Sequence, residues 1–230
     1  MIDSVLDKAK ALGASLAGIV QLDEAVRARI ELPNEVDPTH RFTVLLVLAL
    51  AHDEAQPELD WWGGPGGTEG NRRLQEISAA VKRILAQEYD VHSHILPYHP
   101  WKGGILLKNA AALAGVGVIG ANNLLITPEY GPRVRLKGML LGKPKETRFF
   151  GKNLVSAEPN PISGPCDACP KPCWQACPQK AFASGAYDRG RCAVQMELDE
   201  AKPHIHQDAK AGTSYVEYCR ACELACLVGK

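Results

Sequence analysis

Cysteine is absent from the first 165 residues of this 230-residue chain, and all eight cysteines lie in its last third. No cysteine elsewhere is therefore available to pair with them. Disulfide frameworks are typical of short secreted chains, whereas this chain is longer. It opens with Met1-Ile2-Asp3-Ser4 and shows neither the basic nor the apolar region of a secretory signal peptide. These features argue against a disulfide scaffold.

The sequence also lacks an excess of charge and a long apolar run. Lys and Arg number 26, Asp and Glu also number 26, and the formal net charge is zero. A broad phosphate-binding surface usually requires a basic excess. The longest apolar run, residues 42–51, is about half as long as a bilayer-spanning helix and is typical of a buried strand. We therefore expect a soluble, cytoplasmic protein that does not enter a membrane.

The cysteines that are present form two groups and one isolated position. The first group has the spacing C-x2-C-x3-C-x3-C-P, and the group near the end has the spacing C-x2-C-x3-C. Bacterial ferredoxins have the similar run C-x2-C-x2-C-x3-C-P, whose fourth cysteine ligates the other cluster of a pair. This spacing predicts one 4Fe-4S cluster on Cys166, Cys169, Cys173 and Cys226. It predicts a second 4Fe-4S cluster on Cys177, Cys192, Cys219 and Cys222.

Two other interpretations of the cysteines stay open. Paired C-x-x-C motifs can form tetrahedral zinc sites, but a zinc site does not explain the tight four-cysteine run that ends in Cys177-Pro178. Disulfides are the other alternative, which the length of the chain and its opening residues disfavour.

The apolar periodicity before the cysteines predicts an α+β domain. The predicted helices cover residues 3–12, 23–32, 71–89 and 106–114. The predicted strands cover residues 15–22, 42–50, 91–96, 122–127 and 133–141. Residues 143–165 contain four prolines and are predicted to be a linker. We therefore expect an α+β domain over residues 1–155 and a cysteine-rich domain over residues 156–230.

Residues 115–120, Gly-Val-Gly-Val-Ile-Gly, match the pattern G-x-G-x-x-G. The dinucleotide-binding form of this pattern follows a strand and opens a helix. Here a predicted helix precedes it and a predicted strand follows it. No acidic residue lies about twenty positions further on, where Arg135 stands. The pattern therefore does not predict a nucleotide site, and we expect a tight turn and a close approach of the backbone to a neighbour or a ligand.

Residues 114–120, followed by Asn123-Leu-Leu-Ile126, resemble the segment A-G-L-G-W-I-G-x-x-x-L-L of the epoxyqueuosine reductase family. That family also has a four-cysteine run ending in Cys-Pro, then a lone cysteine, then a C-x2-C-x3-C group, as this chain does. The resemblance covers most of the chain, and reductive dehalogenases look similar in the same two parts. It implies a nitroreductase-like domain that binds cobalamin, followed by a two-cluster ferredoxin-like domain.

The resemblance also implies a path for electrons. A ferredoxin or flavodoxin would supply them, and the two clusters would pass them to the cobalt of a base-off cobalamin. The sequence contains no Asp-x-His-x-x-Gly motif, which argues against a histidine-ligated cobalamin. On this resemblance the candidate cobalamin contacts follow the glycine motif and extend onto the next strand: Asn123, Leu124, Leu125, Tyr130, Gly131 and Arg135. Ordinary turn and strand packing is the alternative for these residues.

The chain departs from the family at two places. Epoxyqueuosine reductases have an aspartate acid about a dozen residues before the glycine segment, whereas residues 97–103 of this chain contain no carboxylate. Tyr98, His99 and Lys102 are the candidate proton donors there. The family also has a helical-repeat tail that helps hold tRNA, whereas this chain ends four residues after Cys226. We therefore expect a small-molecule substrate or a corrinoid protein rather than tRNA.

Three functions are compatible with this sequence. The leading hypothesis is a cobalamin-dependent iron–sulfur reductase. The second is an electron-transfer protein, or a reductive activator of the corrinoid on a partner protein. The third is a shortened epoxyqueuosine reductase that acts on tRNA.

Overall fold

The computed structural model describes residues 2–52, 62–63, 69–99, 102–143, 164–205 and 214–229. The chain forms two compact units that are built from interleaved segments. The first unit comprises Met1–Ala51, Arg73–Val118 and Val134–Ile162. The second unit comprises His52–Arg72, Ile119–Arg133 and Ser163–Lys230. The boundary predicted between residues 155 and 156 lies outside the described residues.

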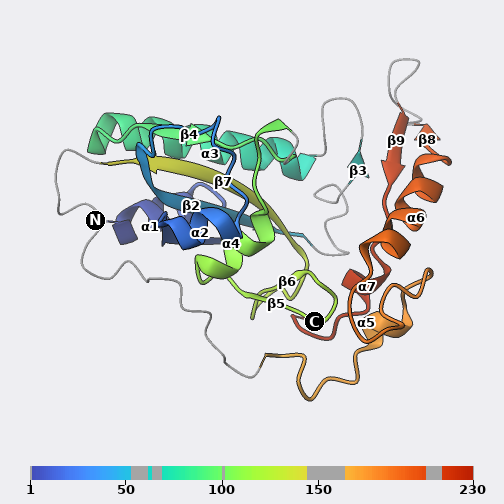
Figure 1. The fold of residues 1–230 in the computed structure, drawn as a ribbon. Coiled ribbons are helices and arrows are strands. Elements are labelled where there is room, and N and C mark those ends of the chain that lie inside the picture. The colour runs from blue at the N-terminus through green and yellow to red at the C-terminus, as the bar shows by residue number, and fades with distance from the viewer. Residues whose placement is uncertain are drawn as a thin grey trace. The chain divides into compact units, whose positions relative to one another are not determined.

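The first unit is organised around a four-stranded antiparallel sheet with the order β1-β2-β7-β4 (Figure 1). The strands are β1 (Leu16–Gln21), β2 (Phe42–Ala51), β4 (Ser93–Ile95) and β7 (Val134–Gly142). Leu46 of β2 lies opposite Ile19 of β1 on one side and Met139 of β7 on the other. The apolar run of residues 42–51 is therefore an inner strand, as its composition predicts.

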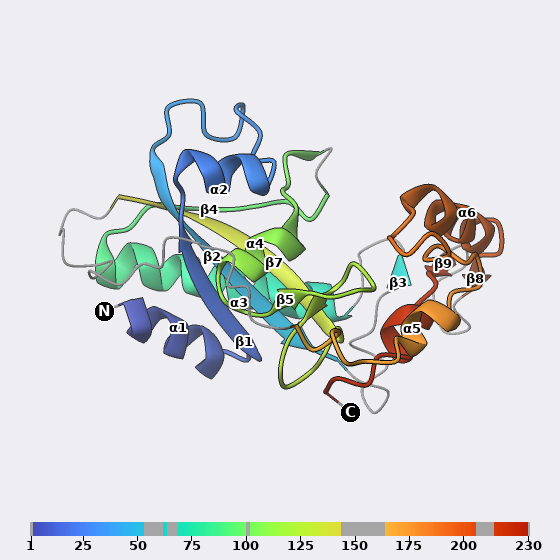
Figure 2. The same ribbon diagram turned by 60° about the horizontal axis from the view of Figure 1, so that its bottom comes forward.

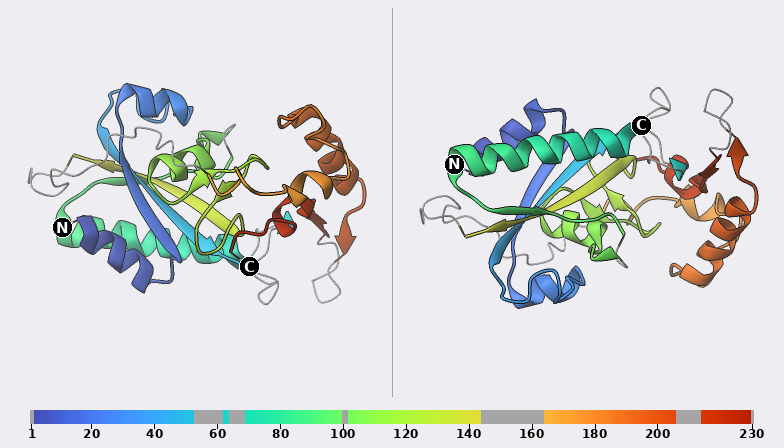
Figure 3. Two further views of the ribbon diagram at one scale, coloured as in Figure 1. Left: turned by 90° about the horizontal axis from the view of Figure 1, so that it is seen from below. Right: turned by 90° about the horizontal axis from the view of Figure 1, so that it is seen from above.

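Helices cover both faces of this sheet. α1 (Ile2–Ala11) and α3 (Glu69–Tyr89) lie on one face, and α2 (Glu24–Arg29) and α4 (Leu107–Leu113) lie on the other (Figures 2 and 3). α2 begins after Asp23, whose carboxylate accepts a hydrogen bond from the Val26 N–H at 2.7 Å, as expected of an N-cap. Within the described ranges, no helix has the length and apolar character needed to cross a bilayer.

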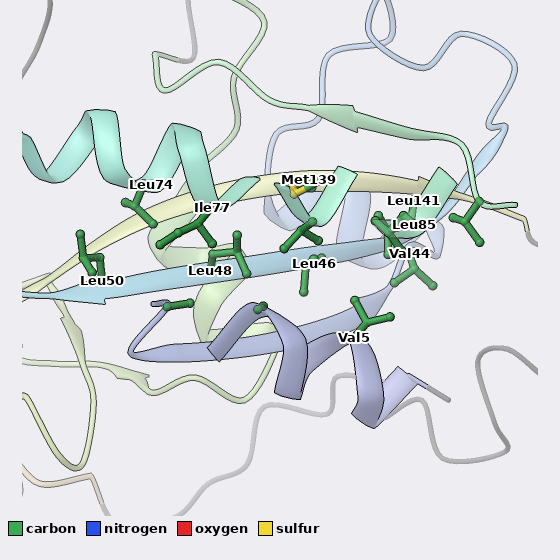
Figure 4. Packing of buried hydrophobic residues seen from close by; sticks show 14 residues of the cluster. Val5, Val44, Leu46, Leu48, Leu50, Leu74, Ile77, Leu85, Met139 and Leu141 are labelled. Carbon is green, nitrogen blue, oxygen red and sulfur yellow. The ribbon is translucent and has the colours of Figure 1, made fainter. Parts of the chain in front are cut away.

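The main core lies between the sheet and the α1 and α3 face. Alternate residues of β2 point toward these helices because side chains of a strand alternate between its two faces. Val44, Leu46, Leu48 and Leu50 therefore pack with side chains of the two helices (Figure 4). The partners on the helices include Val5, Leu74, Ile77 and Leu85. The periodicity of 3.6 in α3 and of 2 in β2 thus produces one continuous apolar layer.

The second unit contains short elements around the cysteines. Its helices are α5 (Pro172–Gln175), α6 (Arg189–Glu200) and α7 (Ala221–Leu224). A three-stranded sheet has the order β3-β9-β8, formed by β3 (Trp62–Gly63), β9 (Ser214–Glu217) and β8 (His204–Ile205).

The glycine motif joins α4 to a small two-stranded sheet of β5 (Val118–Ile119) and β6 (Leu125–Ile126). The strand predicted over residues 122–127 is therefore shorter than expected. The Asn122 carboxamide oxygen accepts a hydrogen bond from the Leu124 N–H at 3.2 Å, and Asn123 has a φ of +60°. This left-handed turn, to which asparagine is well suited, replaces the beginning of the predicted strand.

Candidate functional site

The eight cysteines are free thiols and form two groups of four within the second unit. Cys173 interacts electrostatically with the other three members of its group. Cys222 interacts in the same way with the three members of the other group. The first group is Cys166, Cys169, Cys173 and Cys226. The second group is Cys177, Cys192, Cys219 and Cys222. These are the same two sets that the sequence spacing predicts as ligands.

Burial and repulsion from neighbouring cysteines oppose the ionisation of Cys173 and Cys222. Burial raises the pKa of Cys173, and the neighbouring cysteines raise it further. Burial also raises the pKa of Cys222 to about 12, with a further contribution from Cys219. Four thiolates held together in this way require a compensating positive charge, which a bound metal centre supplies. The chemistry of each group therefore fits a cationic metal centre.

Two kinds of metal centre are held by groups of four cysteine thiolates. A tetrahedral zinc ion with Zn–S bonds of about 2.3 Å brings its thiolates within about 4 Å of one another. Among the residues that the structure describes, no three His, Cys, Asp or Glu side chains converge closely enough to hold one metal ion. An iron–sulfur cluster of the 4Fe-4S type is also held by four cysteine thiolates.

Backbone N–H groups donate hydrogen bonds to the cysteine sulfurs. Lys171 donates to Cys169 Sγ at 3.4 Å, and its φ of +52° turns the chain within the longer spacing before Cys173. Ala181 donates to Cys177 Sγ at 3.3 Å. Such hydrogen bonds stabilise the thiolate form and are one of the factors that set the potential of an iron–sulfur cluster.

The segment after the glycine motif belongs to the same unit and contacts both groups. The Ala121 N–H donates to Cys166 Sγ at 3.3 Å. The Ala121 carbonyl accepts a hydrogen bond from the Trp174 indole N–H at 2.9 Å. The Asn122 side-chain amide donates to the Cys222 carbonyl at 3.4 Å. The two residues that directly follow the glycine motif therefore lie against the cysteines.

A buried side-chain cluster supports the second cysteine group. His52 is buried, and its Nδ1 lies 3.3 Å from Nη2 of Arg220. Its Nε2 lies 3.6 Å from Oε1 of Glu223. Arg220 and Glu223 also pair with each other at 2.7 Å. Arg220 directly follows Cys219, and Glu223 directly follows Cys222. The cluster therefore holds the backbone that carries both cysteines.

The candidate cobalamin contacts fall in both units. Five of the six lie in the second unit, and Arg135 lies in β7 of the first unit, where it is 1% exposed. Leu125 is buried, whereas Asn123, Leu124 and Tyr130 are half-buried.

The backbone at Gly131 lies close to the backbone at Val228, near the end of the chain. A Cβ atom added to Gly131 would lie 2.0 Å from the Val228 carbonyl oxygen. The Arg133 guanidinium donates to the same carbonyl at 2.9 Å. Gly131 is therefore required by the backbone packing of this segment.

The candidate proton donors lie in the loop after β4. The rings of Tyr98 and His99 meet edge to face with centroids 5.1 Å apart. Burial raises the pKa of Tyr98, although the Arg135 guanidinium opposes this effect. Lys102 lines a pocket of about 650 Å³ in the first unit, to whose lining Tyr98 and His99 do not contribute. Pro100 and Trp101, between them in the sequence, lie outside the described residues.

Sequence reasoning missed the other basic residues of this pocket. Arg41 and Lys137 line it together with Lys102. Lys137 is only 9% exposed and lies in β7, which is otherwise mostly apolar. A charged residue at an alternate position of an apolar strand is the sequence signal that could have identified it.

No family model matches the chain. The chain is 26% identical over 171 residues to the epoxyqueuosine reductase of Lactococcus garvieae (strain Lg2), a match that covers 74% of this chain and 43% of that protein. The chain thus spans less than half the length of this curated relative.

The fold of the chain is similar to solved structures of epoxyqueuosine reductases and of a reductive dehalogenase. An epoxyqueuosine reductase from Bacillus subtilis matches with a TM-score of 0.64 and 20% identity, over all of this chain and 65% of that one. A catabolic reductive dehalogenase in complex with 3-bromo-4-hydroxybenzoic acid matches with a TM-score of 0.56 and 15% identity, over 77% of this chain and 25% of that one.

The mixed helix and strand fold is therefore similar to the folds of two kinds of reductase. The chain is similar in sequence to one of these two kinds, epoxyqueuosine reductase. These findings confirm the resemblance that the glycine segment and the cysteine order indicate.

Proposed function

We propose that this protein is an iron–sulfur oxidoreductase that passes single low-potential electrons through two 4Fe-4S clusters to a base-off cobalamin. The observation that carries the proposal is the grouping of the eight thiols into two sets of four within one compact unit. The similarity to epoxyqueuosine reductase supports it. A ferredoxin or flavodoxin is the proposed electron donor.

The clusters, when bound, supply one-electron transfer at potentials that extend down to about −700 mV in proteins. The protein contributes the ligands and their surroundings. The N–H donors of Lys171, Ala121 and Ala181 stabilise negative charge on the sulfurs. The cobalamin contacts are proposed on the segment that follows Ala121 and Asn122, because those two residues contact one cysteine group each.

A proton donor is the second requirement of a reductase. Lys102 is the proposed donor because it faces a pocket that can admit a substrate. Tyr98 is a second candidate, since its phenol is protonated at neutral pH and burial raises its pKa further. His99 contacts Tyr98 and is proposed as its positioning partner.

The test uses anaerobically purified protein reconstituted with iron and sulfide, and then titrated with cob(II)alamin. Electron paramagnetic resonance follows the cobalt, with and without reductant. A change to a base-off cobalt signal at stoichiometric protein is expected. An unchanged cobalt signal beside intact, reducible clusters would overturn the cobalamin part of the proposal.

A second candidate is an electron-transfer protein that reductively activates the corrinoid of a partner protein. The absence of a carboxylate from residues 97–103 favours it, because no acid stands where the resemblance implies one. Reducible clusters that leave free cobalamin unchanged, together with reduction of a corrinoid on an added partner protein, would support this function. Conversion of the epoxide in a tRNA anticodon stem-loop would instead identify an epoxyqueuosine reductase.

A further inference from the structure

The pocket of the first unit has the size of a small-molecule site. Its volume of about 650 Å³ lies within the usual range of ligand pockets. The walls come from the segment between α2 and β2, from α3, from β4 and the loop after it, and from β7. All of these lining residues belong to the first unit, so the pocket requires neither the cysteines nor a cofactor to be complete.

Lys137 is the most unusual residue of this pocket. It is 9% exposed, and burial lowers its pKa. Among the described residues, none accepts a hydrogen bond from its ammonium group or forms an ion pair with it. Lys137 lines the pocket, and an ammonium group that is partly withdrawn from water attracts an anionic group. An anion bound in the pocket supplies the missing charge.

The other ionisable groups of the pocket also favour an anion. Arg41 and Lys102 are cationic, whereas Glu35 is the one carboxylate in the lining. Burial, together with Lys82 and Arg41, lowers the pKa of His94, which is therefore neutral at neutral pH. Among the described lining residues, the three cations Arg41, Lys102 and Lys137 outnumber the single carboxylate of Glu35, so the lining has a net positive charge.

The remaining walls of the pocket are largely apolar. Val36, Ile95, Leu96 and Pro97 lie beside the basic side chains. The Arg41 guanidinium lies over the Phe42 ring at 4.9 Å, which keeps it oriented. A ligand that pairs with the basic side chains and also packs against the apolar ones has an anionic oxygen group at one end and an apolar body.

We propose that this pocket binds a small organic anion, whose carboxylate or phosphate group pairs with Lys137 and is further neutralised by Arg41 and Lys102. The apolar body of the ligand packs against Val36 and Ile95. The proposal goes beyond the function above, because it does not depend on the clusters or on cobalamin.

Isothermal titration of the reconstituted full chain with sodium benzoate, sodium acetate and inorganic phosphate tests this site. Benzoate is expected to bind more tightly than acetate, because only benzoate fills the apolar part of the pocket. Tighter binding of phosphate than of benzoate would identify a phosphate-bearing ligand, and the reverse order would identify a carboxylate. Absence of binding by all three probes in the millimolar range would overturn the proposal.

The variant Lys137→Met separates this site from adventitious binding. Methionine retains most of the volume and removes the charge, so the variant is expected to fold. Its Kd for the preferred probe is expected to rise about tenfold or more, as expected for a lost charge-assisted hydrogen bond. The matched control is Lys10→Met on the exposed surface of α1, which should bind as the unmodified chain does.

Arg41→Gln provides a second measurement in case Lys137→Met does not fold. Arg41 is exposed at the rim, so its replacement does not disturb the core. Weaker binding is expected for this variant too. Equal Kd values for the two pocket variants and Lys10→Met would overturn the proposal. Because cobalt signals play no part in these titrations, failure of this site and failure of the cobalamin proposal are distinguishable.

Discussion

Gly131 holds a conformation and a space that no other residue can hold without a change nearby. Its φ is +57°, and a Cβ atom would lie 2.0 Å from the Val228 carbonyl oxygen. Gly131→Ala is therefore expected to lower the free energy of unfolding by about 3 kcal/mol, through backbone strain and steric overlap together. Urea unfolding followed by circular dichroism measures this loss.

Gly185→Ala is the matched control for this prediction. Gly185 has a φ of +84°, but no atom lies within 4 Å of the position of an added Cβ. Only backbone strain of about 1 kcal/mol is expected there. Equal losses at the two positions would show that the contact of Gly131 with Val228 does not matter.

Lys137 predicts a dependence of stability on pH. Burial lowers its pKa in the folded chain below the ordinary value of 10.5. Between the folded pKa and 10.5 the unfolded chain binds more protons at this site, so the free energy of unfolding rises with pH. The stability of the unmodified chain should therefore rise relative to that of Lys137→Met as the pH approaches 10.5.

The measurement is the difference in free energy of unfolding between these two proteins from neutral to alkaline pH, without added anions. Both proteins share Glu35, Arg41, His94 and Lys102, so the titration of these neighbours largely cancels in the difference. A difference that stays constant with pH would show that Lys137 keeps its ordinary pKa in the folded chain.

Individual residues differ in how far the sequence predicts their roles. The cysteines that interact in the structure are the same two sets that the motif spacing predicts, whereas their role as cluster ligands stays a prediction. The charge of Lys137 within an apolar strand is visible in the sequence, but its burial is not. The pocket is lined by Gln75, Pro97 and Lys102, which come from distant parts of the sequence. A basic residue in a strand is usually exposed, and only the folded chain distinguishes this one.

Asp188 caps the N-terminus of helix α6, which carries the predicted cluster ligand Cys192. The Asp188 carboxylate accepts a hydrogen bond from the Arg191 N–H at 3.1 Å, and α6 carries Cys192. Asp188→Ala is expected to lower the free energy of unfolding by about 1 kcal/mol. Asp188→Asn should retain most of the stability, since asparagine caps helices equally well. Urea unfolding of both variants tests this, and equal losses would contradict the capping role.

The helices and strands of the first unit could be predicted because their apolar periodicities are long. Strand β2 and helix α3 match the predicted ranges closely. The predicted strand of residues 122–127 is mostly a turn, because Asn122 and Asn123 stabilise a local alternative. Short elements depend on such side-chain contacts, which periodicity does not reveal.

The arrangement of the chain into interleaved units depends on long-range contacts. Residues 119–133 join the cysteine-bearing unit, where Ala121 and Asn122 make hydrogen bonds to cysteines 45 and 100 positions away in the sequence. Contacts at such separations leave no local pattern. The sequence predicts that the glycine motif of residues 115–120 permits a close approach. In the structure the residue that follows the motif, Ala121, contacts Cys166.

Pairs of cysteine variants test the grouping in the whole molecule. Cys173→Ser combined with Cys226→Ser removes two ligands from one group and should leave about half of the bound iron. Cys173→Ser combined with Cys192→Ser weakens both groups and should remove most of the iron. Iron content after reconstitution distinguishes the two double variants. Equal iron losses in both would contradict the assignment of these cysteines to separate clusters.

The most direct test of the central claim is the iron and acid-labile sulfide content of the anaerobically reconstituted chain. Two 4Fe-4S clusters require about eight iron and about eight sulfide per chain, together with a broad visible absorption that reductant bleaches. Both contents are expected close to eight per chain. Zinc bound at one or two ions per chain, with no acid-labile sulfide, would contradict it.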